Sequence, residues 1–84
     1  RPAYTAQLTV DLEENDRRED YLRAHLSYSA AGAPLVTPFS RQDSSMFSRL
    51  AHADCLVIRA PHAAPARAGD TVEYLPLPSG MLRI

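Results

Sequence analysis

Residues 21–28 read Tyr21-Leu22-Arg23-Ala24-His25-Leu26-Ser27-Tyr28, and their side chains fall into two alternating sets. Successive side chains of a β-strand point to opposite faces. One face then carries Leu22, Ala24, Leu26 and Tyr28, and the other carries Tyr21, Arg23, His25 and Ser27. The pattern predicts a half-buried strand with Arg23 on the face opposite its apolar stripe.

A turn and another strand follow this segment. Residues 30–34 read Ala-Ala-Gly-Ala-Pro, in which Gly32 supplies the permissive φ of a turn, and residues 35–39 are the next predicted strand. Pro38 has no N–H for a sheet ladder, so this strand is expected at an edge or a bulge. The two strands are predicted to form a β-hairpin.

Three further strands and one helix complete the prediction. Residues 5–10 alternate, residues 55–58 are continuously apolar, and residues 71–77 lie between a Gly-Asp turn and Pro78. Apolar pairs at i,i+4 spacing in residues 46–51 predict two helical turns. We expect a mostly all-β fold, a small five-stranded antiparallel β-barrel with one short helix between strands 3 and 4, because closing the sheet hides its edges.

Length and charge limit what the chain can be. Its 84 residues make a single domain, residues 1–84. A net charge of −1 and the lack of lysine argue against nucleic-acid binding, and no apolar run approaches the roughly 20 residues of a membrane span. Cys55 has no partner for an internal disulfide, which favours a reducing, cytoplasmic location. The abrupt start at Arg1, on the verge of a strand, indicates a fragment of a longer protein.

The candidate binding residues are Arg23 and three side chains of one turn, Gln42, Ser44 and Ser45. A helix N-terminus offers unpaired backbone N–H groups and the positive end of the peptide dipole. A guanidinium adds a charged fork of donors. The combination predicts a site for a small oxyanion. Two plainer interpretations stay open: a surface arginine that covers apolar neighbours, and a helix cap without a ligand.

We expect neither a metal site nor independent catalysis in this domain. Its three histidines (His25, His52 and His62) lie far apart in the sequence without a paired cysteine. Cys55 opens an apolar strand, where a cysteine acts as a small hydrophobe. The sequence shows no nucleophile–base pair and no glycine-rich phosphate cradle. The isolated domain is therefore expected to be inactive and to hold no cofactor.

Four segments follow one another in the order and spacing of a known module. Residues 18–26, 42–51, 53–58 and 68–74 read Arg-Glu-Asp-Tyr-Leu-Arg-Ala-His-Leu, Gln-Asp-Ser-Ser-Met-Phe-Ser-Arg-Leu-Ala, Ala-Asp-Cys-Leu-Val-Ile and Ala-Gly-Asp-Thr-Val-Glu-Tyr. With these segments the chain resembles the C-terminal lobe (domain IV) of the molybdopterin molybdenumtransferases, the MoeA and gephyrin E-domain family. The resemblance covers nearly the whole chain, and it implies a small β-barrel.

The resemblance also implies a function in molybdenum cofactor biosynthesis. The family inserts molybdate into adenylylated molybdopterin and releases AMP with the help of Mg²⁺, and this lobe forms one wall of the active-site cleft. The protein's own upstream catalytic domain would hold Mg²⁺ and the pterin, and the full-length protein would be a cytoplasmic homodimer. Arg23 and Ser44, with Gln42 and Ser45 beside them, would lie near the molybdate. Asp43 departs from the family, which usually has Gly or Ser there, and brings a negative charge to the turn.

Two other functions compete with this one. The first is a non-catalytic β-barrel that docks a peptide or another protein domain, with the Arg23 face as a rim. The family includes a scaffolding branch that binds receptor peptides beside this lobe, which supports this alternative. The second is a nucleic-acid-binding barrel of the OB type, which the acidic charge balance disfavours most.

Overall fold

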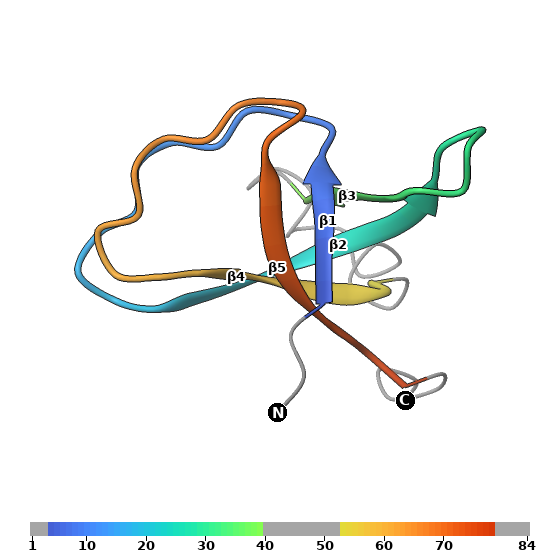
Figure 1. Cartoon of the computed structure of the whole chain (residues 1–84). Coiled ribbons are helices and arrows are strands. Elements are labelled where there is room, and N and C mark those ends of the chain that lie inside the picture. The colour runs from blue at the N-terminus through green and yellow to red at the C-terminus, as the bar shows by residue number, and fades with distance from the viewer. Residues whose placement is uncertain (1–3, 40–52, 79–84) are drawn as a thin grey trace.

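The computed structural model describes residues 4–39 and 53–78, and these contain five strands. The strands are β1 (Tyr4–Leu8), β2 (Asp20–Tyr28), β3 (Pro34–Pro38), β4 (Cys55–Arg59) and β5 (Thr71–Pro76). They close into a barrel in the order β1-β3-β2-β4-β5 (Figure 1). The predicted five-stranded barrel is confirmed. The helix predicted over residues 46–51 lies outside the described residues, and within the two described ranges no helix is long and apolar enough to cross a membrane.

One pairing differs from the antiparallel barrel that we predicted. β1 and β3 run parallel, with Gln7 opposite Leu35 and Leu8 opposite Val36, whereas the other neighbouring strands pair antiparallel. The reason is geometrical. Strand directions around a closed ring can alternate at every step only if the number of strands is even, so five strands require at least one parallel pair. Here that pair is also a short one.

β2 is the longest of the five described strands, and its two halves pair with different strands. Its first half, from Asp20 to Ala24, pairs with β4, and its second half, from Ala24 to Tyr28, pairs with β3 in the predicted hairpin. Ala24 is therefore the position at which β3 ends and β4 begins. Its side chain is fully buried inside the barrel. A small side chain suits a point where two partner strands converge on the core.

The core lies inside the barrel and is built from the inward-facing residues of the strands and one loop residue. These are Ala6, Leu8, Ala24, Val36, Cys55, Val57, Ala66 and Tyr74. The predicted apolar face of β2 is confirmed, because Leu22 and Leu26 pack against this cluster. Tyr28 is the exception, with 63% of its surface exposed. It ends the strand beside the hairpin turn, beyond the reach of the core.

Two long connections leave the barrel together and run side by side (Figure 1). One joins β1 to β2 (residues 9–19) and the other joins β4 to β5 (residues 60–70). Leu12 and Ala66 exchange two backbone hydrogen bonds of 2.8 and 2.9 Å, and the Asn15 amide donates to the Ala63 carbonyl at 3.0 Å. Most side chains of the connection over residues 9–19 are exposed, but its backbone is hydrogen-bonded to the connection over residues 60–70.

Arg59 attaches both connections to the end of β4. It is the last residue of β4, and only 7% of its surface is exposed. Its guanidinium Nη2 donates to the carbonyl of Glu13 at 2.7 Å and to the carbonyl of Ala64 at 3.1 Å. The two acceptors belong to different connections, so one side chain joins both to the barrel. The burial of Arg59 was not predicted from the sequence.

Candidate functional site

Arg23, the first predicted binding residue, lies in the middle of β2 with its side chain exposed. Its neighbour Ala24 points into the barrel, so the alternation of a strand directs Arg23 outward. Across the ladder it lies opposite Leu56 of β4. Within residues 4–39 and 53–78, no carboxylate forms an ion pair with its guanidinium. Arg23 is therefore an exposed, positively charged side chain on the outer surface of the barrel.

The backbone at Arg23 is also the point from which the connection between β3 and β4 departs. The amide of Phe39 donates to the Arg23 carbonyl at 2.9 Å, and the amide of Asp54 donates to the Ala24 carbonyl at 2.9 Å. Both flanks of the connection are therefore attached to adjacent residues of one strand. Gln42, Ser44 and Ser45 lie outside the described residues. Their approach to Arg23 stays a prediction.

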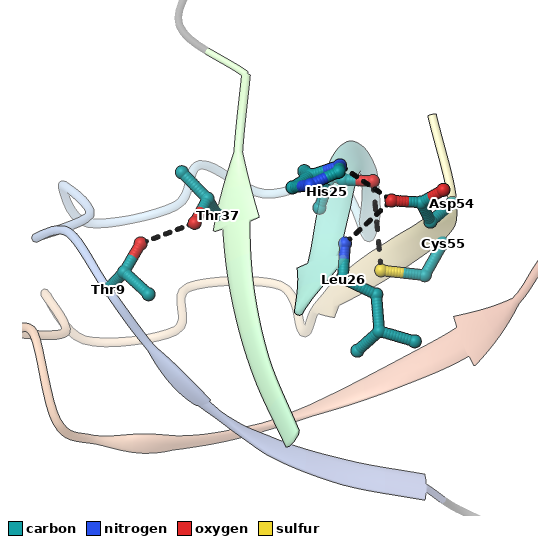
Figure 2. Close-up of polar contacts among 7 residues, drawn as sticks. Thr9, His25, Leu26, Thr37, Asp54 and Cys55 are labelled. Carbon is teal, nitrogen blue, oxygen red and sulfur yellow. Dashed lines mark hydrogen bonds and ion pairs between the residues drawn. The ribbon is translucent and has the colours of Figure 1, made fainter. Parts of the chain in front are cut away.

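His25, two residues beyond Arg23 on β2, pairs with the carboxylate of Asp54, the residue before β4. His25 Nδ1 is 2.7 Å from Asp54 Oδ2, and the same oxygen accepts the Leu26 amide at 2.9 Å (Figure 2). Asp54 directly precedes β4, and its carboxylate thus accepts a hydrogen bond from a backbone N–H of β2. The two side chains keep 60% and 41% of their surfaces exposed, so the pair faces solvent.

The His25–Asp54 pair was not predicted from the sequence, although the outward position of His25 could be. His25 shares the outward face with Arg23 by simple alternation, and only its potential as a metal ligand was considered. Asp54 precedes the apolar run of β4, where a polar residue looks like an ordinary strand start. Only the pairing of β2 with β4 brings the two side chains together.

Hydroxyl groups extend the polar surface on the other side of His25. Thr37 of β3 lies directly opposite His25 across the ladder. Its hydroxyl is 2.6 Å from the hydroxyl of Thr9, which follows β1 (Figure 2). The outer surface near Arg23 therefore presents a row of polar side chains from Thr9 through Thr37 and His25 to Asp54.

Cys55 lies on the inner side of the same region and does not contribute to this surface. It is fully buried, and its Sγ lies 3.8 Å from the Ala24 carbonyl (Figure 2). Burial, followed by the nearby Asp54 charge, raises the pKa of the thiol to about 11. The thiol is therefore neutral near pH 7, and the prediction of a small buried hydrophobe is confirmed.

The polar surface near Arg23 includes two side chains that can donate hydrogen bonds to a ligand. In the described part of the chain, no group of three or more His, Cys, Asp or Glu side chains could hold a metal ion. Arg23 and His25 place two nitrogen-bearing side chains on one solvent-facing strand surface. A guanidinium and an imidazolium both donate charge-assisted hydrogen bonds to oxyanions.

Comparison with known protein families identifies the family of this barrel. The family model described as MoeA C-terminal region (domain IV) matches residues 5–77, which cover the five strands apart from Tyr4 and include the connection between β3 and β4. The search of curated proteins found no match. The matched range covers most of the chain and includes every residue of the predicted site. The chain therefore belongs to the MoeA C-terminal region (domain IV) family, a domain of an enzyme of molybdenum cofactor biosynthesis.

Proposed function

We propose that this domain forms one wall of the cleft in which a full-length molybdopterin molybdenumtransferase inserts molybdate into adenylylated molybdopterin. The observation that carries the proposal is the family match over residues 5–77, which contains Arg23 and the 42–45 turn in one continuous stretch. In this proposal the upstream domain of the same protein holds Mg²⁺ and the pterin, and the full-length protein is a cytoplasmic homodimer.

Arg23 has the central function in this proposal. Its guanidinium donates to two oxygens of the molybdate dianion through a charge-assisted fork. Its exposed position on β2 supports this assignment, because the guanidinium lies on the outer surface of the barrel rather than in its core. Gln42, Ser44 and Ser45 complete the anion cradle through their side chains and backbone N–H groups.

The hydrogen bonds at Arg23 and Ala24 support a shared location for these residues. They attach both flanks of the β3–β4 connection to the strand segment that carries the guanidinium. A connection that leaves and returns beside Arg23 can bring its polar turn to the same ligand. Holding the dianion against the pterin dithiolene, with the adenylate as the leaving group, is mainly a proximity contribution to catalysis.

The test is Arg23→Ala in the full-length protein, with the molybdate dependence of cofactor formation as the measurement. We expect the apparent molybdate affinity to fall at least about tenfold, or about 1.4 kcal/mol, because the charged fork is lost. The matched control is Arg67→Ala, which removes an exposed arginine from the β4–β5 connection. An unchanged molybdate dependence in Arg23→Ala would remove this arginine from the site.

A further inference from the structure

We propose that Asp54 is a positioning residue for the molybdate site, because its contacts with β2 fix the point at which the β3–β4 connection returns beside Arg23. This inference rests on the proposed function, which takes Arg23 and the polar turn of that connection as ligands of the oxyanion. Asp54 touches no ligand in this scheme. It acts through the backbone that it holds.

Asp54 is bonded to the barrel through its backbone and its side chain at once. Its amide donates to the Ala24 carbonyl at 2.9 Å, and its carbonyl accepts the amide of Leu77, which follows β5, at 2.9 Å. Its carboxylate Oδ2 accepts the Leu26 amide at 2.9 Å and lies 2.7 Å from Nδ1 of His25 (Figure 2). Asp54 therefore joins β2 to the chain beyond β5, immediately before β4 begins.

The carboxylate of Asp54 extends the pairing of β2 beyond the end of β4. β4 begins at Cys55, which pairs with Ala24, so no residue of β4 lies opposite the second half of β2. Backbone groups of residues two apart along a strand point to the same side. The Leu26 amide therefore points, like the Ala24 carbonyl, to the side on which β4 lies. There the Asp54 side chain supplies the acceptor that the strand does not.

The same stretch of β2 carries Arg23 and holds the other flank of the connection. The Phe39 amide donates to the Arg23 carbonyl at 2.9 Å, one residue before the carbonyl that accepts the Asp54 amide. The connection thus leaves and returns within residues 23–26 of β2. A return point that moves would change the distance between the guanidinium and the turn, and a misplacement of about 1 Å lowers rates by up to about a hundredfold.

Two variants of the full-length protein separate the geometry of Asp54 from its charge. Asp54→Ala removes the carboxylate and leaves both backbone bonds in place, so the Leu26 amide loses its acceptor. We expect the apparent KM for molybdate to rise about tenfold, with kcat at saturating molybdate within about twofold of wild type, because saturation selects the correctly placed connection. Asp54→Asn keeps an oxygen that accepts the Leu26 amide and should restore most of the wild-type KM.

Asp70→Ala is the matched control. Asp70 makes a corresponding set of bonds before β5, where its carboxylate Oδ2 accepts the Arg67 amide at 2.9 Å and its carbonyl accepts the Leu8 amide at 2.9 Å. The variant therefore loses the same kind of bond without touching the backbone that holds Arg23. We expect it to keep the wild-type KM for molybdate. Urea denaturation shows whether the two alanine variants lose similar stability.

A merely structural function for Asp54 would lower the amount of folded enzyme, and with it kcat, without changing the KM for molybdate. An unchanged KM in Asp54→Ala, an equal rise in Asp70→Ala, or no recovery in Asp54→Asn would each overturn the inference. If Asp54→Ala does not fold, Asp54→Glu replaces it. Glutamate keeps the charge and moves the acceptor by one methylene, and we expect the KM to rise at least about threefold.

Arg23→Ala distinguishes the failure of this inference from the failure of the proposed function. A higher molybdate KM in Arg23→Ala together with a wild-type KM in Asp54→Ala would overturn only the present inference. A wild-type KM in Arg23→Ala would remove the proposed site, and the positioning function of Asp54 with it.

Discussion

The carbonyl oxygen of Arg23 accepts a hydrogen bond from the amide of Phe39, with 2.9 Å between the two atoms. The next carbonyl along β2, that of Ala24, accepts the amide of Asp54 at the same distance. Two consecutive residues of one strand thus hold the end of β3 and the start of β4. The proposed anion-binding side chain of Arg23 therefore projects from the part of the barrel where three strands meet, which restricts the motion of its backbone.

Ala24 is the first position at which this junction can be tested. Its side chain is fully buried between two partner strands, so a larger residue would have to displace core neighbours. We expect Ala24→Val to lower the free energy of unfolding by about 1–3 kcal/mol through overpacking. Urea denaturation provides the measurement. The same substitution at exposed Ala60 should change stability by no more than about 0.5 kcal/mol, and an equal loss at both positions would contradict the assignment.

Local patterns predicted the strands and the faces of β2 because burial imposes a period of two on a half-buried strand. They did not predict the parallel pairing of β1 with β3, since neighbours that are distant in the sequence leave no local signal. The His25–Asp54 contact was missed for the same reason, because it depends on the pairing of β2 with β4. The positions of Gln42, Ser44 and Ser45 relative to Arg23 stay a prediction.

The burial of Arg59 was also not predicted, although the alternation of residues along β4 indicates it. A charged residue after an apolar run looks like the exposed end of a strand. Yet Cys55, Val57 and Arg59 share one parity along β4, and all three are buried. Counting by twos from the buried residues would have placed the arginine inside the barrel wall. Sequence alone would still not have identified its two carbonyl partners.

The bonds made by Arg59 predict a measurable contribution to stability. Arg59→Met keeps much of the apolar stem but leaves the Glu13 and Ala64 carbonyls without their donor. We expect the free energy of unfolding to fall by about 2 kcal/mol, since hydrogen bonds from charged groups are stronger than neutral ones. Thermal or urea unfolding measures this loss. Arg67→Met is the control, because Arg67 is exposed on the same connection; a similar loss there would show that charge alone is responsible.

Gly69 gives a prediction about backbone conformation without steric contact. Its φ is 96°, its amide donates to the Leu8 carbonyl at 2.8 Å, and a Cβ placed on it would meet nothing within 4 Å. Gly69→Ala should therefore cost about 1 kcal/mol, entirely from the disfavoured dihedral angle. Gly69→Asn should cost less, because asparagine tolerates positive φ better than alanine. A larger loss for Asn than for Ala in urea denaturation would indicate a steric cause instead.

Cys55 makes the stability of the barrel depend on alkaline pH. Burial and the Asp54 charge raise the pKa of its thiol from 9.0 to about 11 in the folded protein. The unfolded chain loses the thiol proton at lower pH, so the unfolded state is favoured as pH rises from about 9 towards about 11. By about pH 10 the difference contributes roughly 1.4 kcal/mol of lost stability relative to neutral pH.

Cys55→Ala isolates this contribution from every other titration. The variant starts from a lower stability because it leaves a cavity, so the quantity to compare is the change between about pH 7.5 and about pH 10 rather than either absolute value. Urea denaturation with a reductant present should show a decrease about 1.4 kcal/mol smaller in the variant than in wild type. The other ionisable side chains are present in both proteins, so their contributions largely cancel in this comparison. Equal decreases would mean that the folded thiol ionises as readily as the unfolded one, and that its fully buried position does not keep it neutral.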